Sequence, residues 1–155
     1  MLPKTILVPT DLSEGGEYAL DYACELAAKL GATIHLLNVI GVPGLGVPEL
    51  GVALTTTVID EILFENQKAL DALAASRRSI APIGQVLLKT GDARDLINQT
   101  AKELGADLIV MGTHGRRGIS RALLGSVAET VVRSAPCAVL TVRAPTRERS
   151  GRHAA

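Results

Sequence analysis

Aromatic side chains are nearly absent from this chain. Its 155 residues include two tyrosines, one phenylalanine and no tryptophan. Apolar residues nevertheless make up 47% of the sequence, so valine, isoleucine, leucine and alanine must form the core. An aliphatic core of this kind is typical of a parallel sheet covered by helices. The length is that of one domain with a sizeable core.

The chain also lacks an excess of charge and a cysteine pattern. Sixteen basic residues balance sixteen acidic ones, which gives no global attraction to nucleic acid or to a membrane surface. Two cysteines without a motif exclude a disulfide framework and a zinc site. With no signal peptide and no apolar run of about 18 residues, we expect a soluble cytoplasmic protein without nucleic-acid or membrane partners.

Charge is unevenly distributed along the chain. The stretch from Arg143 to the C-terminus carries four arginines and one glutamate. Apart from alanine it lacks apolar residues beyond Thr146, so it cannot bury enough surface to order itself. We therefore expect one domain over residues 1–143 and a disordered basic tail over 144–155.

Short apolar runs alternate with segments of helical periodicity along the whole domain. The predicted strands are 6–8, 33–40, 83–88, 108–111 and 137–142. Helices are predicted between them, the first capped by Ser13 or Asp11 and ended by Gly31. Alternating strands and helices with short turns predict an α/β fold, with an open five-stranded parallel sheet and helices on both faces.

Three residues that could carry chemistry have simpler structural interpretations. Cys24 lies on an apolar helical stripe, which favours a buried thiol over a reactive one. His35 has no partner at metal-ligand spacing, so we expect a satisfied structural histidine. Asp92 and Asp95 resemble a carboxylate pair, but a helix cap and a first-turn charge explain them.

The most informative stretch runs from residue 108 to residue 129. A buried strand leads to Gly112 and Gly115, and Gly125-Ser126 follow nine residues later. Ser126 and Glu129 match the Ser-x-x-Glu capping box, which predicts a helix beginning at Ser126. A helix N-terminus next to a glycine turn can bind an anion.

Cationic residues strengthen this interpretation, and two common nucleotide motifs are missing. Arg116, Arg117 and Arg121 lie between the glycines. The stretch contains neither a Walker loop nor the G-x-G-x-x-G dinucleotide fingerprint. Spacing alone leaves two interpretations open, a phosphate-binding loop and tight packing at a strand–helix turn.

The pattern Gly112-x2-Gly115-x9-Gly125-Ser126 resembles the nucleotide-binding signature of the universal stress protein family, in its ATP-binding branch. Residues 6–14, I-L-V-P-T-D-L-S-E, resemble the family's opening strand and acidic turn. Residues 36–40, L-L-N-V-I, resemble its second strand, in which members often carry histidine in place of Asn38. The resemblance covers about residues 3 to 143.

The resemblance implies a Rossmann-like sheet in the order 3-2-1-4-5, which binds ATP or a related adenine nucleotide. Strands one and four would be neighbours, and Asp11 would lie beside the glycines. Asp11 would hydrogen-bond near the base or contribute to a Mg²⁺ site shared with the phosphates. The implied nucleotide-binding residues are Pro9, Thr10, Asp11, Val39, Met111, Gly112, Gly115, Arg116, Gly125, Ser126 and Val127.

Three functions remain open at this point. The first is a nucleotide-binding regulatory protein of the stress response with at most slow ATP hydrolysis. The second is a true ATPase or adenylyl-transferring enzyme, for which His114 is the only titratable candidate near neutral pH in the loop. The third is a dimeric interaction module that does not use nucleotide. The sequence does not separate ATP from AMP or cyclic nucleotides.

The fifth predicted strand and one glycine-rich loop suggest further roles. Residues 138–142 form an apolar segment without charge before Arg143. If this strand is the sheet edge, a homodimer that pairs two copies would cover its open backbone groups. The loop from Gly41 to Gly51, with two prolines, is interpreted as a mobile loop or a lid.

Overall fold

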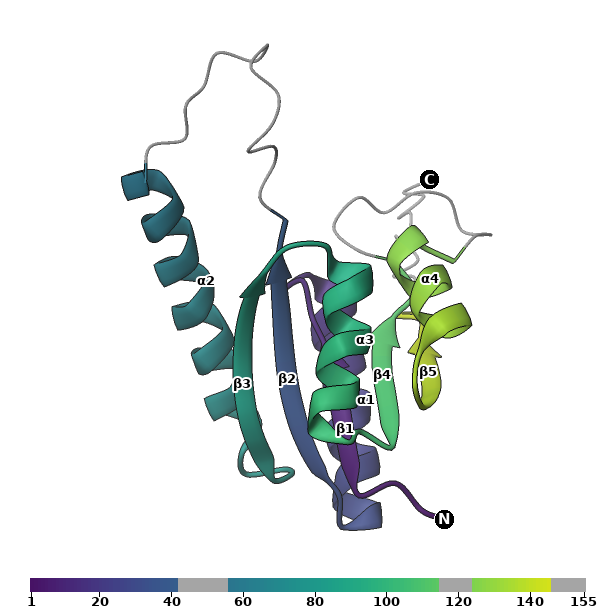
Figure 1. The fold of residues 1–155 in the computed structure, drawn as a ribbon. Coiled ribbons are helices and arrows are strands. Elements are labelled where there is room, and N and C mark those ends of the chain that lie inside the picture. The colour runs from purple at the N-terminus through teal and green to yellow at the C-terminus, as the bar shows by residue number, and fades with distance from the viewer. Residues whose placement is uncertain (42–55, 115–123, 146–155) are drawn as a thin grey trace, which may run out of the picture.

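The computed structural model describes residues 1–41, 56–114 and 124–145, in which helices and strands alternate along the chain (Figure 1). The elements are β1 (Thr5–Pro9), α1 (Glu14–Leu30), β2 (Thr33–Ile40), α2 (Thr56–Arg77), β3 (Ile83–Thr90), α3 (Ala93–Leu104), β4 (Leu108–Gly112), α4 (Ser126–Ser134) and β5 (Ala138–Val142). No helix in these ranges is both long enough and apolar enough to cross a membrane.

The strands form one parallel sheet in the order β3-β2-β1-β4-β5. The predicted α/β class, strand order and parallel pairing are therefore confirmed. The chain builds the sheet outward from β1 in one direction, and then continues from β4 in the other direction. The strand order thus reverses between β1 and β4, at the position where open α/β sheets form ligand crevices.

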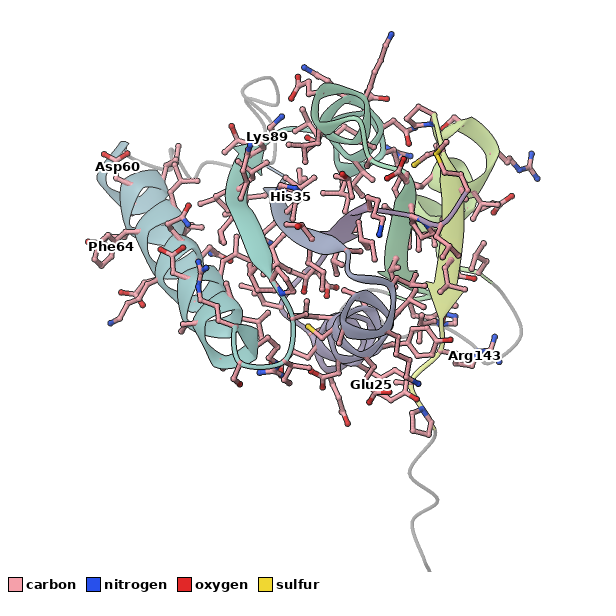
Figure 2. The ribbon with its side chains drawn as sticks, turned by 90° about the horizontal axis from the view of Figure 1, so that it is seen from below. Glu25, His35, Asp60, Phe64, Lys89 and Arg143 are labelled. Atoms are coloured by element: carbon pink, nitrogen blue, oxygen red, sulfur yellow. The ribbon has the colours of Figure 1, made fainter. Side chains whose placement is uncertain are left out.

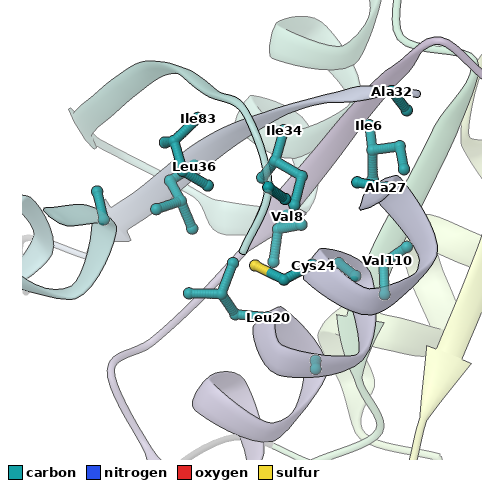
Figure 3. Packing of buried hydrophobic residues seen from close by; sticks show 14 of the residues in the cluster. Ile6, Val8, Leu20, Cys24, Ala27, Ala32, Ile34, Leu36, Ile83 and Val110 are labelled. Carbon is teal, nitrogen blue, oxygen red and sulfur yellow. The ribbon is translucent and has the colours of Figure 1, made fainter. Parts of the chain in front are cut away.

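Side chains of alternate strand residues supply two separate cores, one on each face of the sheet. The first core packs α1 and α2 against Ile6, Val8, Ile34 and Leu36, and Cys24 is fully buried within it (Figure 3). Burial raises the pKa of the Cys24 thiol to about 11, in agreement with a structural thiol. The second core packs α3 and α4 against the opposite face.

The described caps of α1 and α3 follow the chemistry predicted from the sequence. Ser13 caps α1 by accepting the Gly16 N–H, and Gly31 ends the helix in the left-handed region with φ of 62°. Asp92 caps α3 by accepting the Arg94 N–H at 2.8 Å. The Arg94 side chain pairs with the same carboxylate and holds the pKa of Asp92 at about 2. A cap and its ion pair therefore account for Asp92.

Arg77 connects the two helices on the first face. Its guanidinium lies 2.9 Å from Asp21 and 3.6 Å from Glu17, both on α1. Arg77 lies near the C-terminus of α2, where the helix dipole favours a cation. The described contacts of its guanidinium are nevertheless with the two carboxylates of α1. Arg77 thus fixes α2 beside one flank of α1.

Two sequence-based expectations concern residues outside the described ranges. The loop interpreted over residues 41–51 lies outside the described ranges from residue 42 onward. The tail predicted over residues 144–155 lies outside these ranges from residue 146 onward. Both stay predictions.

His35 fills an irregularity in the sheet. The pairing of β2 with β3 shifts register between Ile34 and Leu36, and the His35 Nδ1 accepts the Gln85 N–H at 3.0 Å. Gly84 leaves room for the imidazole, since a Cβ there would lie 2.8 Å from the ring. Figure 2 shows His35 and Lys89 on the side of the sheet that α3 covers. The expected structural role of His35 is confirmed.

Protonation of His35 is expected to destabilise the fold. Burial lowers the pKa of His35 below 6.5, and a protonated imidazole cannot accept the Gln85 N–H. The stabilisation is therefore complete above pH 6.5 and is lost as the pH falls from 6.5 through the folded-state pKa. In urea unfolding at several pH values, His35→Phe should lower the free energy of unfolding by about 1 kcal/mol at pH 7.5 and should flatten its pH dependence below pH 6.5. An unchanged slope would contradict this role.

Candidate functional site

The site begins with the turn that follows the central strand β1. Pro9 is the last residue of β1, and the Thr10 N–H donates to the Leu37 carbonyl of β2 at 2.8 Å. The Thr10 carbonyl accepts the side-chain amide of Asn38 at 2.8 Å. Thr10 and Asn38 are 6% and 3% exposed, so this junction between the two strand ends is buried.

The next residues form a tight turn into α1. Leu12 has φ of 61°, a left-handed conformation that is uncommon for a residue with a branched side chain. Its N–H donates to the Thr10 hydroxyl at 3.1 Å. Asp11 Oδ1 accepts both the backbone N–H and the hydroxyl of Ser13. Hydrogen bonds within the turn therefore hold the strained backbone.

Gly16 allows α1 to approach this turn closely. A Cβ at Gly16 would lie 2.6 Å from the Thr10 hydroxyl oxygen and 3.0 Å from Asp11 Oδ1. Real Cβ atoms essentially never approach another heavy atom to 2.6 Å, so a larger residue at Gly16 would displace the Thr10 hydroxyl that accepts the Leu12 N–H. The Gly15-Gly16 pair thus has a packing role that outweighs its low helix propensity.

The second half of the site connects β4 to α4. The Thr113 N–H donates to the Val142 carbonyl of β5 at 3.1 Å, and the Thr113 carbonyl accepts the Gly125 N–H at 2.7 Å. A Cβ at Gly125 would lie 2.9 Å from that same carbonyl oxygen. Glycine is therefore required for the start of α4 to lie against the end of β4.

The predicted capping box at Ser126 is wrong. Gly125 is the N-cap residue with φ of −61° and ψ of 153°, Ser126 is the first helical residue, and no side-chain hydrogen bond caps the helix. The bond to Thr113 holds Gly125 in the extended conformation, so the helix begins at Ser126, as predicted, but with Gly125 rather than Ser126 at the N-cap position. The Glu129 carboxylate pairs with Arg133 at 2.9 Å. As a consequence, no capping side chain from the described residues covers the first N–H groups of α4.

The glycine at the end of β4 lies against α1. A Cβ at Gly112 would lie 3.1 Å from the Gly15 carbonyl oxygen, so the described contact of Gly112 is with Gly15. His114 follows two residues later, and its Nδ1 lies 2.9 Å from the Thr113 hydroxyl. The imidazole of His114 is thus oriented by the neighbouring side chain.

Most of the predicted site residues lie at one end of the sheet. Pro9, Thr10 and Asp11 follow β1, Val39 is near the end of β2, and Met111 and Gly112 end β4. Gly125, Ser126 and Val127 form the start of α4, which the Thr113 bond holds to the end of β4. Ser126 is exposed and Met111 is buried. Gly115 and Arg116 lie outside the described residues.

Four residues that shape the site are not among the nucleotide-binding residues predicted from the sequence. They are Leu12, Gly16, Asn38 and Thr113. A glycine pair at a helix start signals close packing, and a polar residue within the apolar run 36–40 signals a buried hydrogen bond. No sequence pattern indicates the left-handed backbone at Leu12.

The described residues contain no cluster of side chains that could hold a metal ion at the site. Across residues 1–41, 56–114 and 124–145, no three His, Cys, Asp or Glu side chains gather closely enough to hold a metal ion. The polar groups described at this end of the sheet are mainly backbone N–H groups, hydroxyls and the Asp11 carboxylate. This arrangement is suited to an anionic ligand that meets the positive end of a helix dipole.

Comparison with known proteins identifies relatives over nearly the whole chain. The model of the universal stress protein family matches residues 3–143. A universal stress protein of Methanocaldococcus jannaschii is 36% identical over 149 residues, which cover 95% of this chain and 86% of the relative.

Two solved structures share the fold and contain adenine nucleotides. A universal stress protein from Archaeoglobus fulgidus in complex with dAMP is 26% identical with a TM-score of 0.64, and the match covers 91% of this chain and 98% of that chain. A universal stress protein in complex with cAMP is 27% identical with a TM-score of 0.60, and the match covers 92% and 98%. The family model, the relative and the shared fold agree, and the chain belongs to the universal stress protein family.

Proposed function

We propose that the chain binds ATP or a related adenine nucleotide and acts as a regulatory protein of the stress response in the cytoplasm. One observation carries the proposal: α4 begins at Ser126, after the N-cap residue Gly125, without a side-chain cap, and its start lies against the end of β4, beside the position where the strand order reverses. Backbone N–H groups at such a helix start bind phosphate. Related structures that hold cAMP and dAMP support an adenine ligand.

The proposed contacts divide between the two halves of the site. The turn of Pro9, Thr10 and Asp11 borders the base and ribose, together with Val39 and Met111. The backbone of Gly112, Gly115, Gly125 and Val127 and the hydroxyl of Ser126 bind ribose and phosphates, and Arg116 adds positive charge.

We propose at most slow ATP hydrolysis at this site. Mg²⁺ would enter with the phosphates, and Asp11 would be its protein partner. Asp11 Oδ1 already accepts two hydrogen bonds from Ser13, so this oxygen serves the turn. Rapid turnover with an acceptor would instead favour the enzyme alternative.

The nucleotide proposal is tested with freshly purified protein. Denaturation followed by mass spectrometry should release an adenine nucleotide, or calorimetry should detect binding of added ATP–Mg²⁺, AMP or cAMP. Gly125→Val should weaken binding at least about tenfold, because its Cβ displaces the Thr113 carbonyl from the start of α4.

A matched variant separates binding from stability. Gly105 has φ of 59° at the end of α3, and no neighbouring atom lies within 4 Å of the position that a Cβ would take there. Gly105→Ala therefore introduces strain of about 1 kcal/mol far from the candidate site, and should bind like the parent. A parent protein that neither contains nor binds any of these nucleotides would overturn the proposal.

We further propose that the chain forms a homodimer through β5. In the described residues β5 pairs only with β4. The Val142 carbonyl faces β4, so Val139 and Thr141, on alternate positions, direct their N–H and C=O groups away from it. A second copy paired antiparallel would satisfy these groups.

Apolar side chains beside β5 support the same interface. Arg77 occupies the Asp21 flank of α1, so Tyr22 projects from the flank that faces β4 and β5. Tyr22 is 45% exposed, and Val132 on α4 is 48% exposed. Both helices contact β5, and a partner strand would bring its own flanking helices against these side chains.

Thr141→Pro is designed to test the dimer. It removes an outward N–H without removing a hydrogen bond to β4. Sedimentation should show a dimer for the parent at micromolar concentration and a monomer for Thr141→Pro. Thr141→Val keeps the N–H and a β-branched side chain, and should remain dimeric. A monomeric parent would reject the interface.

A further inference from the structure

Asn38 is a buried amide at the junction of β1 and β2. It is 3% exposed, and its Nδ2 donates to the Thr10 carbonyl at 2.8 Å. The last backbone bond of this strand pair runs from the Thr10 N–H to the Leu37 carbonyl. The side chain of Asn38 therefore continues the connection between the strands by one residue, into the turn.

The held residue, Thr10, determines the shape of the turn. Its hydroxyl accepts the Leu12 N–H at 3.1 Å, and Leu12 has the left-handed φ of 61°. Gly16 leaves space for the same hydroxyl. A rotation of the peptide between Thr10 and Asp11 would move the Leu12 N–H away from the Thr10 hydroxyl. The side chain of Asn38 thus provides the hydrogen bond that connects the end of β2 to the Thr10–Ser13 turn.

The other end of the amide has no described partner. Asn38 Oδ1 is buried and accepts no hydrogen bond from the described residues, although buried polar groups are nearly always paired. A leucine of similar size would pack at this position without a buried polar atom. The amide is consequently poorly explained by core packing, and well explained by its bond to Thr10.

We propose that Asn38 is a positioning residue of the candidate nucleotide site. It holds the Thr10 carbonyl and so keeps the turn from Thr10 to Ser13 in the shape that receives the ligand. This inference rests on the nucleotide binding proposed above, and it deepens that proposal by assigning a role to a residue that does not itself touch the ligand.

Asn38→Asp gives a reversible test of this role. Above neutral pH the carboxylate has only acceptors, and it repels the Thr10 carbonyl. Burial raises the pKa of such a carboxyl, and the protonated form can donate its O–H to Thr10 as the amide does. Lowering the pH should therefore restore the turn in this variant alone.

The measurement is the ratio of variant to parent Kd for cAMP, ATP–Mg²⁺ and AMP, at pH 8 and at pH 5.5, by calorimetry on folded protein. We expect Asn38→Asp to bind roughly tenfold to hundredfold more weakly at pH 8, and within about threefold of the parent at pH 5.5. Asn38→Leu should bind weakly at both pH values. Taking the ratio at each pH cancels titration of the ligand.

Asn66→Asp is the matched control. Asn66 on α2 makes the same kind of bond, from Nδ2 to the Ile62 carbonyl at 2.8 Å, away from the candidate site. It should bind like the parent at both pH values. Hydrogen exchange of the Leu12 and Ser13 amides should accelerate in Asn38→Leu and remain unchanged in Asn66→Asp.

The outcomes separate the two proposals. A parent that binds, together with an Asn38→Asp variant that binds equally at pH 8 or is not restored at pH 5.5, overturns the role of Asn38 and leaves nucleotide binding intact. A parent that binds none of the three nucleotides overturns both.

Discussion

The hydrogen bond from the Gly125 N–H to the Thr113 carbonyl, 2.7 Å long, is the contact on which the candidate site depends. It brings the start of α4 against the end of β4, although residues 113–125 separate the two elements in the chain. The approach leaves no room for a side chain at Gly125. It also makes Gly125 the N-cap residue and Ser126 the first helical residue.

The same bond links the site to the edge of the sheet. The Thr113 carbonyl accepts the Gly125 N–H, and the Thr113 N–H donates to the Val142 carbonyl at the end of β5. A partner strand that stabilises β5 would therefore also stabilise Thr113, which holds the start of α4. The proposed interface and the proposed ligand site share one short path of backbone hydrogen bonds.

The fold can be predicted from the sequence because its elements are local patterns. Apolar runs such as 108–111, caps such as Ser13 and Asp92, and the left-handed Gly31 each depend on a few neighbouring residues. The strand order follows from a family resemblance, and pairing in the structure confirms it. Cys24 and His35 also have the structural roles that their surroundings in the sequence indicate.

Features that depend on distant contacts cannot be predicted in this way. Ser126 matches a local capping motif, but the contact of Gly125 with Thr113 makes Gly125 the N-cap residue, so Ser126 is the first helical residue instead of the cap. The position of Arg77 suits a helix dipole, whereas its carboxylate partners come from a helix much earlier in the chain. The roles of Gly16 and Asn38 likewise require knowing which segments meet Thr10.

The phosphate contacts proposed for this site are mostly main-chain atoms, and this affects how the site would respond to sequence change. Most substitutions alter side chains and leave the peptide groups of the turn and of the α4 start in place. Substitution scanning would consequently report sensitivity at the supporting glycines and at buried anchors, and little at the surface that a ligand meets. Chains of this architecture can drift far in sequence while the ligand-facing surface stays the same.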